Sequence, residues 1–186
     1  AHLLAQPFAH LLADLVLLQG NVAHAVVRHV EFQLPRAGRI GDPHQRLAAL
    51  DGARALYVGG FLALPAFRSD HLVQLLREAK RRSLATVLDV VIPAGSSATL
   101  DDVRPVLPYA DVFLPNTDEA RVLTGRSDPV EQAETLARIS PTCTMVITEG
   151  RAGAVVRRAN EAWRVGAFAV NSVDESGGGD AFDAGF

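Results

Sequence analysis

The stretch that decides the fold lies at the end of the chain and reads Asn171-Ser172-Val173-Asp174-Glu175-Ser176-Gly177-Gly178-Gly179-Asp180-Ala181-Phe182-Asp183-Ala184-Gly185-Phe186. Residues without a Cβ atom let backbone N–H groups converge on one point and let a ligand approach closely. A helix that begins at Gly178 or Gly179 adds its own unpaired N–H groups and the positive end of its dipole. Together these features predict an anion site, most usefully a phosphate site.

Asp180 follows the three glycines directly and places a negative charge beside this site. Such a charge is unfavourable unless the carboxylate has a chemical task, such as accepting a proton from a nucleophile that attacks a phosphate. A second interpretation stays open on the local pattern alone, because short glycine motifs are weak evidence. In that interpretation the stretch is a flexible glycine loop before a helix with acidic residues at its start.

Residues 174–186 resemble the C-terminal signature of the PfkB carbohydrate kinases, the ribokinase-like family. That signature runs Asp-Thr-Thr-Gly-Ala-Gly-Asp-Ala-Phe and continues into Ala-Gly-Phe. Glu175 and Ser176 stand here in place of the threonines, and Glu175 is the larger departure because it adds charge near the phosphates. The resemblance implies that Asp180 is the catalytic base. It also implies that Gly177, Gly178 and Gly179 form an anion hole for the phosphoryl group, and that Asp174 and Ser176 contact the nucleotide.

The composition fits one soluble, globular domain with a sizeable core. Of the 186 residues, 48% are apolar and 21% are charged. The net charge of −3 provides no basic field for nucleic acid, and no apolar run reaches the length of a membrane span. The single cysteine, Cys143, excludes a disulfide framework and favours a reducing cytoplasm. It lies in an apolar run, where a small buried hydrophobe is a better interpretation than a nucleophile.

Residues 1–50 match the family pattern poorly, although we assign the whole of 1–186 to a single domain. Short strands are expected at 15–18 and 25–27. The expected opening, a strand with a Gly-Gly pair and an asparagine that shapes the sugar site, is not evident here. The segment starts inside the fold, has diverged, or is a misread gene start. Five histidines fall here, without the spacing of a metal site: His2, His10, His24, His29 and His44.

Strands and helices alternate from residue 42 onward, and the resemblance is clear over about residues 53–186. Strands are predicted at 53–61, 86–92, 111–114, 143–148 and 163–169, with helices after Asp42, Ser69, Thr99 or Asp101, Asn116, Asp128 and Gly179. This order predicts an α/β fold with a mostly parallel sheet and helices on both faces, in three layers. The resemblance implies a ribokinase-like domain that is incomplete at its C-terminal end.

A second motif, Leu114-Pro115-Asn116-Thr117-Asp118-Glu119-Ala120, resembles the Pro-Asn-x-x-Glu segment of the same family. Without the resemblance, the local sequence predicts that Asn116 is a helix N-cap and that Glu119 occupies the N3 position of a capping box. The resemblance implies that both residues also face the phosphates and a magnesium ion, largely through water. A carboxylate, waters and substrate phosphates are what magnesium prefers. Both interpretations stay open.

Two further sets of site residues follow from the same resemblance. Residues 148–154 resemble the family's Thr-x-Gly-x-x-Gly turn, which implies nucleotide contacts at Thr148, Gly150 and Gly153. Read alone, the segment is a hairpin turn. Asp89 interrupts an apolar strand, so it should lie near a strand end with a hydrogen-bonding partner. It is a candidate for substrate binding, and a purely structural hydrogen-bonding role is the alternative.

The resemblance implies a kinase that moves the γ-phosphoryl group of ATP, with Mg²⁺, to a hydroxymethyl group of a sugar, nucleoside or related polyol. It implies a cytoplasmic protein and is compatible with a homodimer. One alternative is a catalytically inactive remnant that binds nucleotide or a partner. Another, a dinucleotide-binding oxidoreductase, would need its glycine fingerprint near the first strand. We also expect weak turnover from the chain as given, because a helix of about seven residues is marginal alone.

Overall fold

The protein is built around one sheet of eight strands in the order β2-β1-β3-β4-β5-β6-β7-β8. The computed structural model describes residues 15–19, 26–30, 50, 52–63, 69–171 and 177–185. The strands are β1 (Leu15–Gln19), β2 (Val26–Val30), β3 (Ala55–Phe61), β4 (Ala85–Val90), β5 (Val112–Phe113), β6 (Thr144–Thr148), β7 (Ala154–Arg158) and β8 (Glu161–Val165). The strands expected near residues 15 and 25 are therefore confirmed as β1 and β2.

The four central strands, β3 to β6, are parallel neighbours. The outer strands run antiparallel: β1 pairs with β2 and β3, β7 pairs with β6, and β8 pairs with β7. Parallel neighbours need long crossover connections, and here these carry the helices. The α/β fold with a parallel centre is confirmed. The sheet as a whole is mixed, because the connection between β6 and β7 is short enough to form a hairpin.

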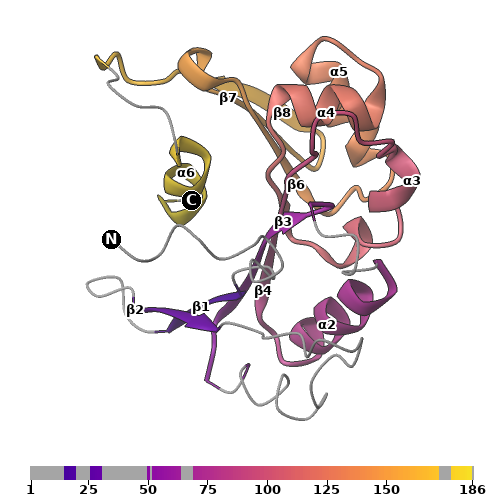
Figure 1. The fold of residues 1–186 in the computed structure, drawn as a ribbon, viewed down its shortest axis with the longest axis vertical. Coiled ribbons are helices and arrows are strands. Elements are labelled where there is room, and N and C mark those ends of the chain that lie inside the picture. Colours follow the sequence, from indigo (N-terminus) through magenta and orange to yellow (C-terminus); the bar gives the residue numbers. More distant parts are fainter. Residues whose placement is uncertain are drawn as a thin grey trace.

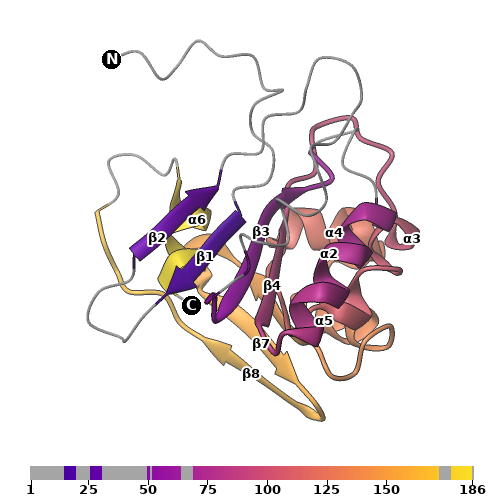
Figure 2. The same cartoon turned by 90° about the horizontal axis from the view of Figure 1, so that it is seen from below.

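The helices cover both faces of the sheet, as expected (Figure 1). They are α2 (Ser69–Arg81), α3 (Leu100–Val103), α4 (Thr117–Thr124), α5 (Pro129–Ala137) and α6 (Gly178–Gly185), with 3-10 turns η2 (Leu107–Tyr109) and η3 (Gly150–Ala152). α2 to α5 lie on one face, whereas α6 lies alone on the other, in both views (Figures 1 and 2). None of these helices is long and apolar enough to cross a membrane. The helix expected after Asp42 lies outside the described residues.

The main core lies between the sheet and α2 to α5. α2 buries Leu72, Leu76 and Ala79, which follow the helical repeat and lie on one face. They join the same core cluster as Leu56 of β3 and Leu88 of β4. Successive residues of a strand point to opposite faces of a sheet. The residues next to Leu56 in β3 and next to Leu88 in β4 therefore point to the other face, on which α6 lies. That second face has a smaller apolar cluster, made of Leu114, Val146 and Ala154 with Tyr57, Val87, Val112 and Val156.

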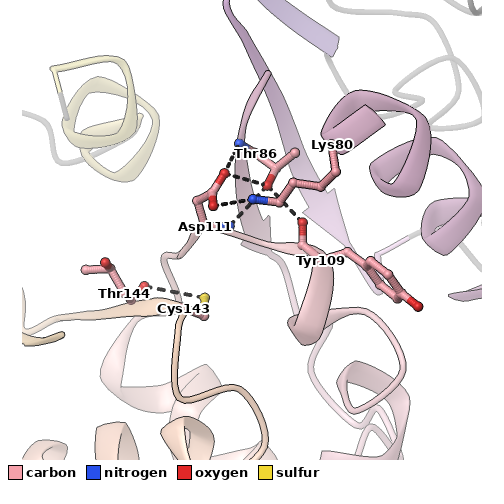
Figure 3. Close-up of polar contacts among 6 residues, drawn as sticks. All are labelled: Lys80, Thr86, Tyr109, Asp111, Cys143 and Thr144. Atoms are coloured by element: carbon pink, nitrogen blue, oxygen red, sulfur yellow. Dashed lines mark hydrogen bonds and ion pairs between the residues drawn. The ribbon is translucent and has the colours of Figure 1, made fainter. Parts of the chain in front are cut away.

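A polar network ties β4 to β5 at their amino ends (Figure 3). Lys80 forms an ion pair with Asp111, whose other carboxylate oxygen lies 2.8 Å from the Thr86 amide and 3.0 Å from its hydroxyl. Burial acts to raise the pKa of Asp111, but the Lys80 and Thr86 donors hold it below its ordinary value. The Thr86 hydroxyl also lies 2.8 Å from the carbonyl oxygen of Tyr109. This network is far along β4 from the carboxyl end, where the candidate site is found.

Several segments differ from the sequence prediction in their bounds, most of them by one or two residues at an end. The strand predicted at 86–92 is β4, which ends at Val90 instead of Ile92, where the chain turns toward Pro93, which cannot donate to a sheet. The helix predicted after Thr99 or Asp101 is the short α3, which the separate turn η2 follows. The last strand is 161–165 instead of 163–169. Cys143 is fully buried, and burial raises the pKa of its thiol to about 12. Its protonated, inaccessible thiol is consistent with a small core residue.

Candidate active site

The carboxyl end of β3 is shaped by Gly59 and Gly60. Pairing between β3 and β4 shifts register between Val58 and Phe61, around these glycines. Gly60 has φ of +69°, a backbone conformation that favours glycine. In this geometry its N–H donates to Oδ2 of Asp89 at 3.1 Å. The partner that the sequence predicts for a carboxylate in this strand is therefore a backbone amide of the neighbouring strand.

The amino end of α4 carries the predicted capping box. Oδ1 of Asn116 accepts hydrogen bonds from the amides of Asp118 and Glu119, both at 2.9 Å. Oε2 of Glu119 accepts in turn from the amide of Asn116 at 2.9 Å. The Glu119 carboxylate also accepts from the backbone of Ile92, which follows β4. The capping role is confirmed, and it fixes the Glu119 side chain against the carboxyl end of the neighbouring strand.

The turn after β6 lies directly beside this helix start. Thr148 forms an isolated parallel bridge with Asn116, and its amide donates to the carbonyl oxygen of Pro115 at 3.1 Å. The Thr117 hydroxyl donates to the carbonyl oxygen of Thr148 at 2.8 Å. The second and third sequence motifs are therefore joined in space. This juxtaposition follows from the parallel pairing of β5 with β6, which brings their carboxyl ends to one edge.

The same turn depends on glycine at two positions. Gly150 and Gly153 have φ of +56° and +104°. A Cβ atom on Gly153 would lie 1.9 Å from the carbonyl oxygen of Val165 in β8. The hairpin interpretation of this segment is confirmed, because β6 and β7 pair antiparallel on either side of η3. The glycines are thus explained by the turn itself, and a nucleotide role for them stays a prediction.

The glycine-rich stretch forms the start of α6, as the sequence predicts. Gly177 has φ of +76° and its carbonyl oxygen accepts from the amide of Ala181 at 2.9 Å. Gly177, Gly178, Gly179 and Asp180 are exposed. Unpaired N–H groups at a helix start therefore lie next to a carboxylate, an arrangement that combines an anion site with a proton acceptor. Asp174 and Ser176 lie outside the described residues.

Asp183, one turn after Asp180, connects α6 to the sheet. Its Oδ2 accepts a hydrogen bond from the hydroxyl of Tyr57 at 2.8 Å. Neither Tyr57 nor Asp183 is among the site residues predicted from the sequence. Two features of the sequence could have indicated them. Asp183 follows Asp180 by three residues, which places both toward one side of a helix, and Tyr57 carries a hydroxyl in an otherwise apolar strand.

The carboxyl groups of this region act on one another. Burial, followed by the charges of Asp183 and Glu119, raises the pKa of Asp89 to about 7, against the Gly60 amide that lowers it. Burial raises the pKa of Glu119, and Asp183 adds to the increase. The pKa of Asp183 is raised by burial and by the charge of Asp180, while its hydrogen bond from Tyr57 acts in the opposite direction. Four carboxyl groups from three elements therefore share one electrostatic environment.

Asp183 links the predicted site residues: its charge acts on Asp89 and Glu119, and the charge of Asp180 acts on Asp183. Within the described ranges, no three His, Cys, Asp or Glu side chains converge closely enough to hold a metal ion by themselves. A magnesium ion does not need such a cage, because it keeps several waters and is bound through one or two carboxylates and substrate phosphates. Burial is the main cause of the raised pKa of Asp89 and of Glu119, and the charge of Asp183 adds to both; a bound cation would offset that added negative charge. The donor set fits magnesium held through water.

Comparison with known sequences gives consistent matches. The family model described as "pfkB family carbohydrate kinase" matches residues 21–186, which begins upstream of the clear resemblance at residue 53. The chain is 30% identical to adenosine kinase of Saccharomyces cerevisiae over 156 residues, covering 78% of this chain and 45% of the relative. It is 27% identical to fructokinase of Escherichia coli over 143 residues, covering 66% of this chain and 47% of the relative. The chain thus spans about half the length of these curated relatives.

Solved structures share the same fold. The structure of a PfkB protein from Polaromonas sp. aligns with a TM-score of 0.61 at 25% identity, over 75% of this chain and 47% of that protein. Arabidopsis thaliana ribokinase, complexed with ribose and ATP, aligns with a TM-score of 0.59 at 20% identity, over 75% of this chain and 44% of that protein. The ribokinase-like fold inferred from the three motifs is therefore confirmed by structure as well as by sequence.

Proposed function

The chain belongs to the pfkB family of carbohydrate kinases, and from that premise we propose that it transfers the γ-phosphoryl group of ATP to a hydroxymethyl group of a sugar, nucleoside or related polyol. One observation carries the proposal: the glycine start of α6 puts Asp180 on the same helix as Asp183, whose charge acts on both Asp89 and Glu119. The amides can bind an anion, and the carboxylate beside them can accept a proton. Phosphoryl transfer to an alcohol needs both groups in one place.

Asp180 is the proposed proton acceptor. The acceptor hydroxyl loses its proton to this carboxylate as its oxygen forms a bond to the γ-phosphorus, and the bond to the bridging oxygen of ADP breaks. The backbone N–H groups of Gly177, Gly178 and Gly179 are aimed at the charge on the phosphoryl oxygens. Such preorganised donors are effective because they need no reorganisation during the reaction. The exposed position of these residues leaves them accessible to a phosphate.

The nucleotide is proposed to lie along the β6–β7 turn. Thr148 and Gly150, with Gly153, form the wall next to the start of α4, and Asp174 with Ser176 completes the contacts on the glycine side. Support comes from the bridge between Thr148 and Asn116, which aligns the turn with the Pro-Asn-x-x-Glu segment. A phosphate chain that extends from this turn toward α6 passes Glu119.

Asn116 and Glu119 are the residues proposed to hold magnesium, through water. Bound magnesium would offset the negative charge of the phosphates. The chain's own contribution is to keep the Glu119 carboxylate fixed by the amides of Asn116 and Ile92. A carboxylate held by two backbone donors keeps its position when the water between it and the ion exchanges.

The acceptor is proposed only as a chemical class. The relatives are named for different acceptors, including fructose, adenosine and ribose. Asp89 is the residue proposed to bind an acceptor hydroxyl, because it lies at a strand end and its Oδ2 is held by Gly60. A carboxyl group with a pKa near neutrality can accept or donate a hydrogen bond to a hydroxyl.

The test is ADP release by the 186-residue chain with ATP and magnesium, for a panel of sugars, nucleosides and polyols that carry a hydroxymethyl group. Polyols with that group blocked as a methyl ether are the matched controls. We expect ADP release that depends on one class of acceptor and disappears with its blocked analogue. ATP binding without acceptor-dependent ADP release for any member would contradict the proposal and favour a nucleotide-binding role.

A further inference from the structure

A hydrogen bond between distant parts of the chain holds α6 against the sheet. The hydroxyl of Tyr57 in β3 donates to Oδ2 of Asp183 in α6 at 2.8 Å, across 126 residues of sequence. α6 lies alone on its face of the sheet among the described helices (Figures 1 and 2). Among the described residues, the Tyr57 hydroxyl supplies a directional contact to α6 from the sheet.

The direction of the Tyr57 ring depends on Gly59. Residues 57 and 59 point to the same face of β3. A Cβ atom on Gly59 would lie 2.8 Å from Cε1, 3.0 Å from Oη and 3.2 Å from Cζ of Tyr57. The ring therefore lies across the backbone of Gly59, in space that any side chain would occupy. Gly59 therefore leaves the room that this orientation of the Tyr57 ring needs.

The surroundings keep Tyr57 a neutral donor. Burial, followed by the charges of Asp89, Asp183 and Asp180, raises the pKa of its hydroxyl above the ordinary value. The phenol therefore stays protonated at neutral pH and can donate to Asp183 without neutralising the carboxyl cluster. A lysine at this position would supply a donor too, but its charge would compete with a cation bound by the carboxylates.

We propose that Tyr57 is a positioning residue for phosphoryl transfer: through Asp183 it fixes the rotation of α6 and so aims Asp180 and the amides of Gly178 and Gly179. The inference rests on the proposed function for its reaction and on the geometry of β3 and α6 for its mechanism. Asp183 follows Asp180 by three residues, so a constraint on one sets the direction of the other. Misplacement of a reacting group by about 1 Å can lower a rate by about 10²-fold.

Kinetics of Tyr57→Phe provide the first test. Loss of the hydroxyl should lower kcat by about tenfold or more and leave KM for ATP nearly unchanged, since positioning acts on the reacting geometry. Tyr109→Phe is the matched control, because Tyr109 is the chain's other tyrosine and belongs to the turn η2. Asp183→Ala should lower kcat to a similar degree, and the double variant should be little worse than either single one. Asp183→Asn keeps an oxygen acceptor for the Tyr57 hydroxyl and should recover part of the loss.

One further variant and one further measurement distinguish a positioning role of Tyr57 from a direct contact with the substrate. Gly59→Ala keeps the hydroxyl but displaces the ring, so it should reproduce the loss of Tyr57→Phe. Hydrogen exchange gives a readout that needs no turnover: the amides of α6, including that of Ala181, should exchange faster in Tyr57→Phe than in Tyr109→Phe. If the chain shows no acceptor-dependent turnover, the proposed function fails, and this exchange measurement still decides the positioning role.

Two results would overturn the inference. One is unchanged exchange in α6 together with unchanged kcat in Tyr57→Phe. The other is a raised KM for the acceptor with unchanged kcat and unchanged exchange, which would make Tyr57 a substrate contact. Faster hydrogen exchange in α6 together with the expected fall in kcat in Tyr57→Phe would support the positioning role of Tyr57.

Discussion

Asp89→Asn is expected to stabilise the protein at neutral and alkaline pH. The side chain lies at the carboxyl end of β4, where burial and the charges of Asp183 and Glu119 raise its pKa from 3.8 to about 7. Asparagine keeps an oxygen that can accept the hydrogen bond from the Gly60 amide, 3.1 Å away. The change therefore removes the charge and leaves the local hydrogen bond in place.

The sign and size of the effect follow from the two pKa values of Asp89. Because the pKa is higher in the folded protein, the folded state binds more protons than the unfolded chain between pH 3.8 and about 7. The free energy of unfolding of the parent therefore falls as pH rises through this window. The difference between 3.8 and about 7, at about 1.36 kcal/mol per pKa unit, corresponds to up to about 4 kcal/mol above pH 7. Below about pH 4 the parent and the variant should be equally stable, because both side chains are then neutral.

Urea unfolding followed by circular dichroism, at pH values from about 4 to about 8 with a chelator present, measures this difference. We expect a steeper decline with pH for the parent than for Asp89→Asn. Asp101→Asn, an exposed position on α3, is the control for the loss of one charge. Parallel pH curves for the parent and Asp89→Asn would refute the reasoning that the carboxyl cluster strains the fold.

Three other substitutions test separate parts of the structure. Glu119→Gln should raise the magnesium concentration needed for half-maximal activity more than it raises KM for the acceptor; equal magnesium midpoints would leave Glu119 with its capping role alone. Gly153→Ala should lower the free energy of unfolding by about 1–3 kcal/mol or more, because its Cβ would lie 1.9 Å from the Val165 carbonyl oxygen. Gly166→Ala, with open space around its Cβ, is the control, and equal urea midpoints for the two would contradict the clash. Asp128→Ala should cost about 1 kcal/mol of stability in the same assay, since its Oδ1 caps two amides of α5, and an unchanged midpoint would contradict this.

Local features of the sequence predicted local structure well. Two helix starts depend on residues at most three positions apart, so they can be read from the chain directly: the capping box of Asn116 and Glu119, and the cap and proline that start α5 at Asp128. The start of α6 at Gly178 follows from the same kind of pattern. The catalytic role of Asp180, the anion hole at residues 177–179 and the nucleotide contacts of the turn stay predictions.

Features that depend on distant segments were not predictable from the chain. The hydrogen bond between Tyr57 and Asp183 joins residues that only the folding of α6 onto β3 brings together. The raised pKa of Asp89 likewise needs burial and the charges of two other elements. The mixed sheet follows in part from the hairpin at residues 148–154, which the sequence predicts, and in part from the antiparallel pairing of β1 with β3, which it does not.

Single-turnover transfer from γ-labelled ATP to an acceptor, by the parent and Asp180→Asn, tests the central claim most directly. The amide has the shape of the carboxylate, so ATP binding by titration calorimetry should be retained and the amides of residues 177–179 should still bind phosphate. Label should appear in the acceptor with the parent, and its rate of appearance should fall by about 10²–10⁴-fold with Asp180→Asn. Equal rates of transfer by the two proteins, at equal ATP occupancy, would contradict the assignment of Asp180 as the base.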